Sequence, residues 1–98
     1  MNLIIGDETQ TMNYLYDVSI ILVNYKTHEL VYDVIQSIHD KSKGFSYEII
    51  IVDNSSDQNE LKKLISLEGT NIKVIDAKAN LGFGKANNLG TSFARGKY

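Results

Sequence analysis

The strongest constraint on the fold is a pattern that occurs three times along the chain. From residue 18 onward, a short apolar run is followed by a polar loop and then by a segment with apolar residues at helical spacing. The apolar runs are VSIILV (18–23), YEIIIV (47–52) and NIKVID (71–76). Short β-branched runs are typical of buried strands, and strands that alternate with helices indicate a parallel sheet with right-handed crossovers. The pattern therefore predicts an α/β fold of three strand–helix units.

The segments between the runs carry helix signals. Thr27 is the predicted N-cap of a helix that starts near His28 and ends before Gly44. The second helix has Asp57 and Glu60 at capping-box spacing, with Ser56 as an alternative cap, and ends at Gly69. The expected buried stripes of these two helices are Leu30, Val31, Val34, Ile35 and Ile38 in the first, and Leu61, Leu64 and Ile65 in the second.

The third helix is expected to follow the loop AKANLGFG and to end at Arg95. Its stripe consists of Ala86, Leu89, Phe93 and Ala94. Arg95 falls in the expected last turn, and Gly96 is the predicted residue just after the helix, where glycine is favoured. The strand before this helix, NIKVID, is the most polar of the three and suits an edge of the sheet.

Residues 1–17 lie outside the repeating pattern. They are either a ragged leader or an extra edge strand through MNYLY (12–16), and residues 18–98 form the domain proper. A chain of 98 residues suits one small domain.

Composition excludes several classes of protein. The net charge of −2, without clustered Lys and Arg, argues against a nucleic-acid binder held by a basic field. The chain has no cysteine, no signal-peptide pattern and no apolar run long enough to span a bilayer. We therefore expect a cytoplasmic protein without a transmembrane segment.

Three loops are the candidate binding segments, because ligands of open parallel sheets bind beyond the carboxyl ends of the strands. They are NYKTH, DNSSD and AKANLGFGKANN. Asp53 either accepts hydrogen bonds from a base or ribose, or forms an Asx turn or helix cap. Tyr25 either stacks on a planar base or covers the first helix, and Asn24 is either a turn residue or a base-edge hydrogen-bonder.

Glycines and a lysine mark the third loop. Gly82 and Gly84 allow close backbone approach to a ligand, and Lys85 adds a positive charge suited to a phosphate. The alternative is a tight turn with a solvated lysine. The dinucleotide fingerprint and the Walker A loop are both absent, and His28 and His39 lack partners at metal-ligand spacing.

Taken in order, VSIILVNYK, YEIIIVDNSSD and NLGFGKANNLGTSFARGKY resemble the start of the family 2 glycosyltransferases. These are inverting enzymes of the Rossmann-like, three-layer GT-A fold, and the rhamnosyltransferase-like branch is the most similar. The resemblance covers residues 18–98. It implies a partial GT-A domain with the three parallel strands in the order 3-2-1.

The resemblance also implies a set of nucleotide-binding residues. The end of the first strand contacts the base, and the aspartate that closes the second strand contacts the uracil or thymine ring. The N-x-G-F-x-x-x-N region, whose last asparagine we place at Asn88, helps to hold the nucleotide. The implied nucleotide-binding residues are Val23, Asn24, Tyr25, Asp53, Asn54, Asn80, Gly82, Phe83, Lys85 and Asn88.

The acidic D-x-D motif of the family does not occur in these 98 residues. In the family it holds a divalent metal, Mg²⁺ or Mn²⁺, so we expect the metal and the catalytic base only in a full-length enzyme. The expected function is the nucleotide-sugar-binding portion of a glycosyltransferase of bacterial polysaccharide synthesis. It would bind a UDP- or dTDP-sugar weakly and would be inactive alone. The alternative is a non-enzymatic module that forms homo-oligomers through the edge of VSIILV, or whose edge is covered by the leader around residues 12–16.

Overall fold

The computed structural model describes residues 2–6 and 15–98, and for residues 2–6 it describes the backbone only. These residues form four strands and three helices. The elements are β1 (Asn2–Gly6), β2 (Val18–Asn24), α1 (His28–Lys41), β3 (Tyr47–Asp53), α2 (Gln58–Ile65), β4 (Ile72–Asp76) and α3 (Phe83–Thr91).

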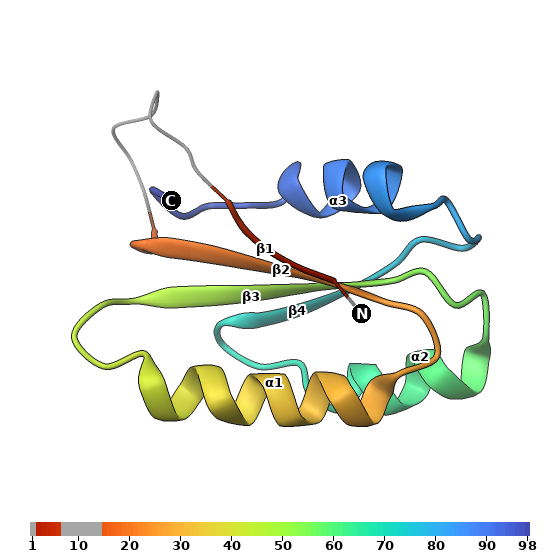
Figure 1. Ribbon diagram of the computed structural model, residues 1–98, viewed down its shortest axis with the longest axis horizontal. Helices are drawn as coiled ribbons and strands as arrows, with labels where there is room; N and C mark the ends of the chain where they lie inside the picture. The colour runs from red at the N-terminus through yellow and green to blue at the C-terminus, as the bar shows by residue number, and fades with distance from the viewer. Residues whose placement is uncertain (1, 7–14) are drawn as a thin grey trace.

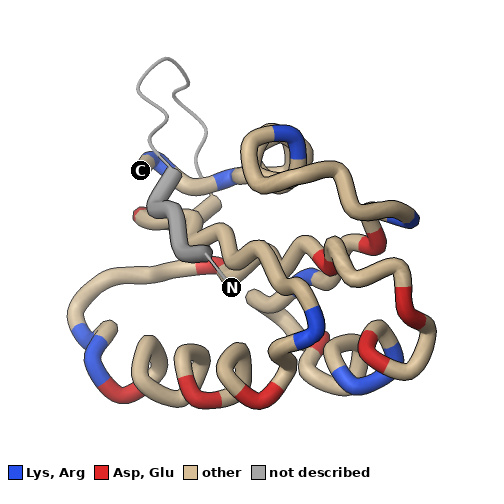
Figure 2. The backbone as a smooth tube through the Cα atoms, turned by 45° about the vertical axis from the view of Figure 1, so that its right-hand side comes forward, with Lys and Arg blue, Asp and Glu red and all other residues tan. Residues whose placement is uncertain are grey.

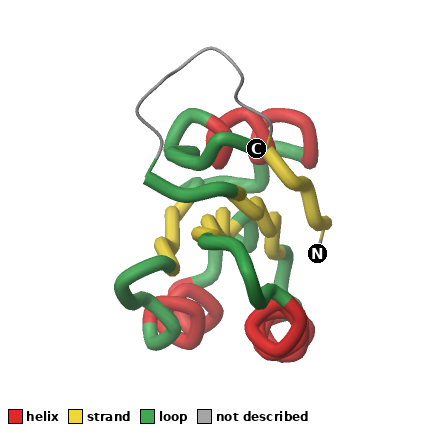
Figure 3. Tube along the Cα trace, turned by 90° about the vertical axis from the view of Figure 1, so that its left-hand side faces the viewer, coloured by secondary structure: helices red, strands yellow, loops and turns green. Residues whose placement is uncertain are grey.

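The sheet lies between two layers of helix (Figure 1). Helices α1 and α2 cover one face, and α3 covers the other, as the end-on view also shows (Figure 3). Strands β2, β3 and β4 pair in parallel, so each strand–helix unit crosses over to its neighbour. The predicted α/β class with three layers is confirmed.

The strand order is β1-β2-β3-β4. Counted from the β1 side, the parallel strands therefore run first, second, third, which is the predicted order 3-2-1 read from the opposite edge. The strand NIKVID is at an edge of this sheet, as its polar composition predicted.

The leader covers the free edge of β2, but not with the segment we expected. Strand β1 pairs antiparallel with β2, with Gly6 opposite Ser19 and Asn2 opposite Val23. Residues 12–14 of the predicted strand lie outside the described residues, and Tyr16 makes only an isolated parallel bridge with Gly96. The covering strand contains the apolar run of residues 3–5, whose two isoleucines are β-branched and favour a strand.

Two apolar clusters form the core, one on each face of the sheet, because side chains alternate along a strand. Ile20, Leu22, Ile49 and Ile51 face α1 and α2, where Val31 and Leu64 are buried. On the other face, Ile21, Val23, Ile50 and Val52 pack with Ala86 of α3. The central strands β2 and β3 are thus buried on both faces, which explains their continuous apolar sequence.

Helix α1 begins where predicted, but Thr27 does not cap it through its side chain. The Thr27 hydroxyl donates instead to Oδ1 of Asn24, at 2.8 Å. In α2 the cap is Asp57, which accepts from the backbone N–H groups of Asn59 and Glu60. Two apolar residues of the predicted stripes are largely exposed: Leu30 at 51% and Ile65 at 45%.

Helix α3 ends at Thr91, four residues before the predicted end. Phe93 lies beyond the helix and is 38% exposed, and the Arg95 backbone and guanidinium are drawn to the buried Glu48 carboxylate. Gly96 does not terminate the helix. A Cβ on Gly96 would lie 2.5 Å from Oγ of Ser19, so glycine allows the chain to cross the start of β2 closely.

Candidate nucleotide site

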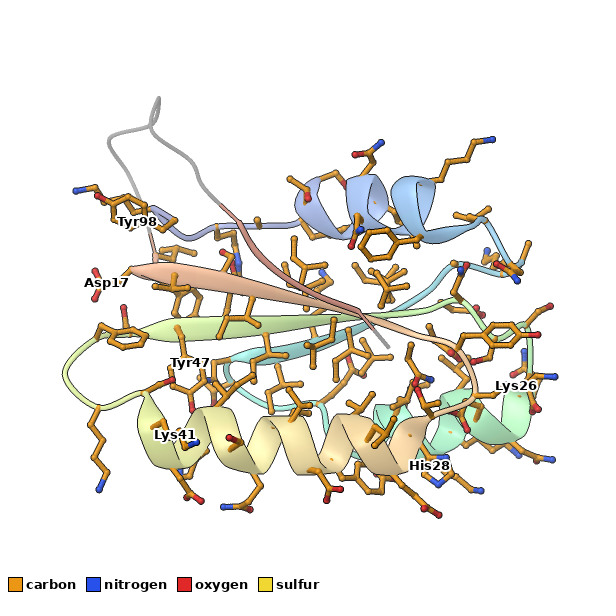
Figure 4. All side chains as sticks on the ribbon, in the orientation of Figure 1. Asp17, Lys26, His28, Lys41, Tyr47 and Tyr98 are labelled. Atoms are coloured by element: carbon orange, nitrogen blue, oxygen red, sulfur yellow. The ribbon has the colours of Figure 1, made fainter. Side chains whose placement is uncertain are left out.

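The three predicted loops meet at the carboxyl end of the sheet. Asp53 lies opposite Asn24 in the register of β2 and β3, and opposite Asp76 in that of β3 and β4. Backbone hydrogen bonds continue the pairing into the loops: the Asn54 N–H donates to the Asn24 carbonyl, and the Ala77 N–H donates to the Asp53 carbonyl. In Figure 4 the labelled Lys26 and His28 mark this end of the molecule.

Asp53 is the central residue at this end of the sheet and is 1% exposed. Its Oδ1 accepts from the Ser55 backbone N–H at 3.2 Å and from Nδ2 of Asn24 at 3.3 Å. Within residues 15–98, no group donates to its other oxygen, Oδ2. The Ser55 contact is the Asx turn that was one of the two predicted roles of Asp53, and it uses only one carboxylate oxygen. That the other oxygen accepts from a base or ribose stays a prediction.

Asn24 is fully buried and uses its whole side chain within the protein. Its amide nitrogen donates to Asp53 and, at 2.8 Å, to Oε2 of Glu60. Its amide oxygen accepts from the backbone N–H and the hydroxyl of Thr27. Asn24 therefore fixes the first loop to the second, and its direct contact with a base stays a prediction.

Asn54 fixes the second loop to the third. Its side-chain nitrogen donates to Oδ1 of Asn80 at 3.0 Å, and its oxygen accepts from the Leu81 backbone N–H at 2.8 Å. The Gly82 N–H also donates to Asn80 Oδ1, at 3.0 Å. Asn54, Asn80 and Gly82 of the predicted set are thus brought together by direct hydrogen bonds.

The other predicted residues divide into one buried and four exposed positions. Val23 is 4% exposed and packs in the core beneath α3. Tyr25 and Phe83 are each 46% exposed, so part of each ring can contact a planar ligand, and Nζ of Lys26 lies over the Tyr25 ring at 5.5 Å from its centroid. Lys85 and Asn88 are exposed on α3, whose N-cap residue, Gly82, has a positive φ and provides no side-chain cap. Whether these residues bind a nucleotide stays a prediction.

Glu60 of α2 also lies at the carboxyl end of the sheet, although the sequence predicted only a capping role for it. It is 7% exposed, and its carboxylate accepts from Asn24 Nδ2 and from the His28 N–H, each at 2.8 Å. Its Oε1 lies 2.7 Å from Nδ1 of His28. Burial alone would raise the pKa of Glu60, but the hydrogen bonds from Asn24 and His28 outweigh burial and hold this pKa below its usual value of 4.5.

Asn87 was also missed. Counted from Asn80, the N-x-G-F-x-x-x-N pattern ends at Asn87 and not at Asn88. Asn87 is 7% exposed, and its Oδ1 is a buried oxygen without a hydrogen-bond partner in the described chain. A strict count of the motif would have found this residue.

Charges of both signs are spread over the molecule without a single-sign patch (Figure 2). In the described part of the chain, no group of three acidic, histidine or cysteine residues could hold a metal ion. The described helices are also too short or too polar to cross a bilayer. The expected cytoplasmic location stays a prediction.

Comparison with known proteins identifies the family. The glycosyl transferase family 2 model matches residues 19–98. A low-salt glycan biosynthesis hexosyltransferase of Haloferax volcanii is 38% identical over 85 residues, which cover 87% of this chain and 24% of the relative. A dolichyl-phosphate beta-glucosyltransferase of Dictyostelium discoideum is 38% identical over 73 residues, covering 67% of this chain and 22% of the relative. No solved structure gives a significant match.

The chain belongs to glycosyl transferase family 2. It spans about a quarter of the length of the curated relatives that it matches. The resemblance read from the three sequence motifs is thereby confirmed.

Proposed function

We propose that these 98 residues form the nucleotide-binding part of a sugar transferase and bind the UDP or dTDP portion of a nucleotide-sugar. The observation that carries the proposal is the Asp53 carboxylate, which is held through Oδ1 and has no donor on Oδ2 among residues 15–98. Uracil and thymine each present a ring N–H that such an oxygen can accept. Burial strengthens this hydrogen bond, since the local dielectric is low.

The exposed groups around Asp53 suit the rest of a nucleotide. The Tyr25 ring offers a stacking surface for the base. The first turn of α3 has no side-chain cap, so its N–H groups can face a diphosphate, and Lys85 adds a positive charge there. The binding is expected to be weak, because Tyr25, Phe83 and Lys85 are exposed and their contacts with a ligand would stay largely solvated.

For the whole protein we propose sugar transfer in the synthesis of a bacterial polysaccharide. The family supports sugar transfer, and the Haloferax volcanii relative that is named for glycan biosynthesis supports a glycan product. The bacterial polysaccharide rests on the sequence resemblance alone. The described residues contain no group that fits a divalent metal, so no step of the proposal passes through one. We propose that residues 1–98 alone bind the nucleotide without transferring the sugar.

The test is a titration of the chain with UDP, dTDP and ADP, followed by NMR. We expect shifts for UDP and dTDP around Asp53 at millimolar concentration, and weaker ones for ADP. The variant Asp53→Asn keeps an oxygen for Asn24 and Ser55 but replaces Oδ2 with an N–H donor, so UDP affinity should fall at least about tenfold.

Asp76→Asn is the matched control. Asp76 ends the neighbouring strand at the position paired with Asp53, and its Oδ1 accepts from the Lys78 N–H. We expect the affinity of this variant for UDP to stay within about twofold of wild type. The proposal fails if millimolar UDP leaves the signals near Asp53 unmoved, or if both asparagine variants bind alike.

The interaction-module alternative has less support, because β1 occupies the edge of β2 through which association was expected. Homo-oligomers through this edge would require β1 to leave it. Light scattering measures this directly: a monomer at all concentrations contradicts the alternative, and a concentration-dependent dimer supports it.

A further inference from the structure

We propose that Glu60 is a positioning residue of the nucleotide site, which acts through Asn24 to hold the Asp53 carboxylate with Oδ2 toward the ligand. The inference rests on the proposed function and adds a residue from α2 to the site. Glu60 itself need not touch the nucleotide.

The first step is the orientation of Asp53. Its Oδ1 has two donors, and only the one from Ser55 is local in sequence. The other, Asn24 Nδ2, comes from the neighbouring strand at 3.3 Å. The Asn24 amide can orient the Asp53 carboxylate only if the amide itself is held in one orientation. Because Asn24 is fully buried, other groups of the protein must hold it.

The second step is the fixation of that amide. Two donors of Thr27 hold its oxygen, and Glu60 Oε2 holds its nitrogen at 2.8 Å, a shorter contact than the one to Asp53. The buried Glu60 carboxylate is thus the firmer partner of the Asn24 nitrogen. The Asn24 amide nitrogen carries two N–H bonds. When Glu60 accepts from one of them, the direction of the other, which donates to Asp53 Oδ1, is fixed as well.

The third step concerns what holds Glu60. Its remaining contacts are the backbone N–H and Nδ1 of His28, at the first residue of α1. A carboxylate at the N-terminus of a helix is stabilised by the unpaired N–H groups there, and Thr27 leaves this place open by not capping α1. Glu60 therefore links three elements, α2, the start of α1 and the end of β2, at one point behind Asp53.

A purely structural role for Glu60 would affect stability alone, so the experiment compares UDP affinity with unfolding by urea. We expect Glu60→Ala and Asn24→Ala each to weaken UDP binding about tenfold, and the double variant to be no weaker, because both act by one route. Independent effects would instead multiply to about a hundredfold.

Two conservative variants separate position from charge, and they keep the test open if Glu60→Ala does not fold. Glu60→Gln can place its amide oxygen where Oε2 lies and accept both hydrogen bonds, so we expect UDP affinity within about threefold of wild type. Glu60→Asp keeps the charge but is shorter by one methylene, so binding should weaken. Glu29→Ala is the control. Oε1 of Glu29 also lies near the His28 ring, 3.9 Å from Nε2, but the Glu29 side chain is 86% exposed and makes no hydrogen bond to Asn24.

The outcomes distinguish this inference from the proposed function. If wild type does not bind UDP, the proposed function fails. If wild type binds and Asp53→Asn does not, but Glu60→Ala and Glu60→Asp bind like wild type, the function stands and the positioning role of Glu60 is overturned. Additive effects of Asn24→Ala and Glu60→Ala would also overturn it.

Discussion

A buried glutamate lies near each end of the sheet, Glu48 in β3 and Glu60 in α2, and the two differ in how their hydrogen-bond networks end. At the amino end, Glu48 is 2% exposed and binds the Ser19 hydroxyl at 2.7 Å as well as the backbone and guanidinium of Arg95. At the carboxyl end, Glu60 binds Asn24 and His28. Figure 4 shows the ends, with Asp17 and Tyr98 near the first and Lys26 and His28 near the second.

The amino-end network is closed. The Ser19 hydroxyl donates to Glu48 and accepts from the Gly96 N–H at 2.7 Å. Both oxygens of the Glu48 carboxylate and the Ser19 hydroxyl therefore have hydrogen-bond partners within the protein. The carboxyl-end network runs from Glu60 through Asn24 to Asp53. It ends at Asp53 Oδ2, which accepts no hydrogen bond from residues 15–98. We infer that the closed network stabilises the fold, and we propose that the open one serves a ligand, because Asp53 Oδ2 can still accept a hydrogen bond.

The largest expected effect is on the closed network. Arg95→Ala removes a guanidinium that is 49% exposed from the buried Glu48 carboxylate, which keeps the Ser19 hydroxyl and the backbone N–H of residue 95, so we expect the free energy of unfolding in urea to fall by about 2 kcal/mol. UDP affinity should be unchanged, since the substitution lies at the far end of the sheet. Lys97→Ala, two residues away and exposed, is the control and should cost less than about 0.5 kcal/mol. A loss below about 1 kcal/mol for Arg95→Ala would contradict a closed structural network.

A smaller effect concerns pH and the open network. Because the folded-state pKa of Glu60 is lowered, its ionised form stabilises the fold above pH 4.5, and this contribution is lost as pH falls through the lowered pKa. We expect Glu60→Gln to be less stable than wild type by about 1 to 2 kcal/mol at pH 7. The difference should shrink toward pH 3. Glu29→Gln, at an exposed carboxylate, should show little such change, and a constant difference for Glu60→Gln would contradict the assignment.

The smallest effect separates two helix starts. Asp57 caps α2 through its side chain, so Asp57→Ala should lower the free energy of unfolding by about 1 kcal/mol. Thr27 holds Asn24 and does not cap α1, so Thr27→Ala should weaken UDP binding more than it weakens α1. Circular dichroism and the UDP titration measure the two effects. Equal losses of helix in both variants would show that Thr27 acts as a cap after all.

Much of the fold could be predicted because its signals are local. The strands around Ile21 and Ile50 are mostly apolar runs rich in β-branched residues, and their burial on both faces follows from the alternation of strands and helices. The end of α3 could not be predicted, since Phe93 and Ala94 continue its apolar spacing. The chain leaves the helix before them because Arg95 binds Glu48, a residue 47 positions earlier, and no local pattern reports such a contact.

The same distinction holds for the candidate site. Asp53 was found because it directly follows a buried strand, and Asn54, Asn80 and Gly82 were found through the family motifs. Glu60 was missed because its spacing from Asp57 has a sufficient local explanation, the capping box. In the structure only half of that box forms: Asp57 caps the Glu60 N–H, while the Glu60 side chain turns to Asn24 and His28.

The crossing of Gly96 over Ser19 has a consequence for the order in which the molecule folds. The two residues are 77 positions apart, whereas the paired strands β2 and β3 are separated by 29 positions at each matched residue. Contacts that close a long loop cost more chain entropy and form late. During synthesis, the three parallel strands can therefore pair before residue 96 has left the ribosome. The contacts at the amino end of the sheet then form after the strand pairing, and the Arg95 guanidinium reaches the Glu48 carboxylate only at that stage.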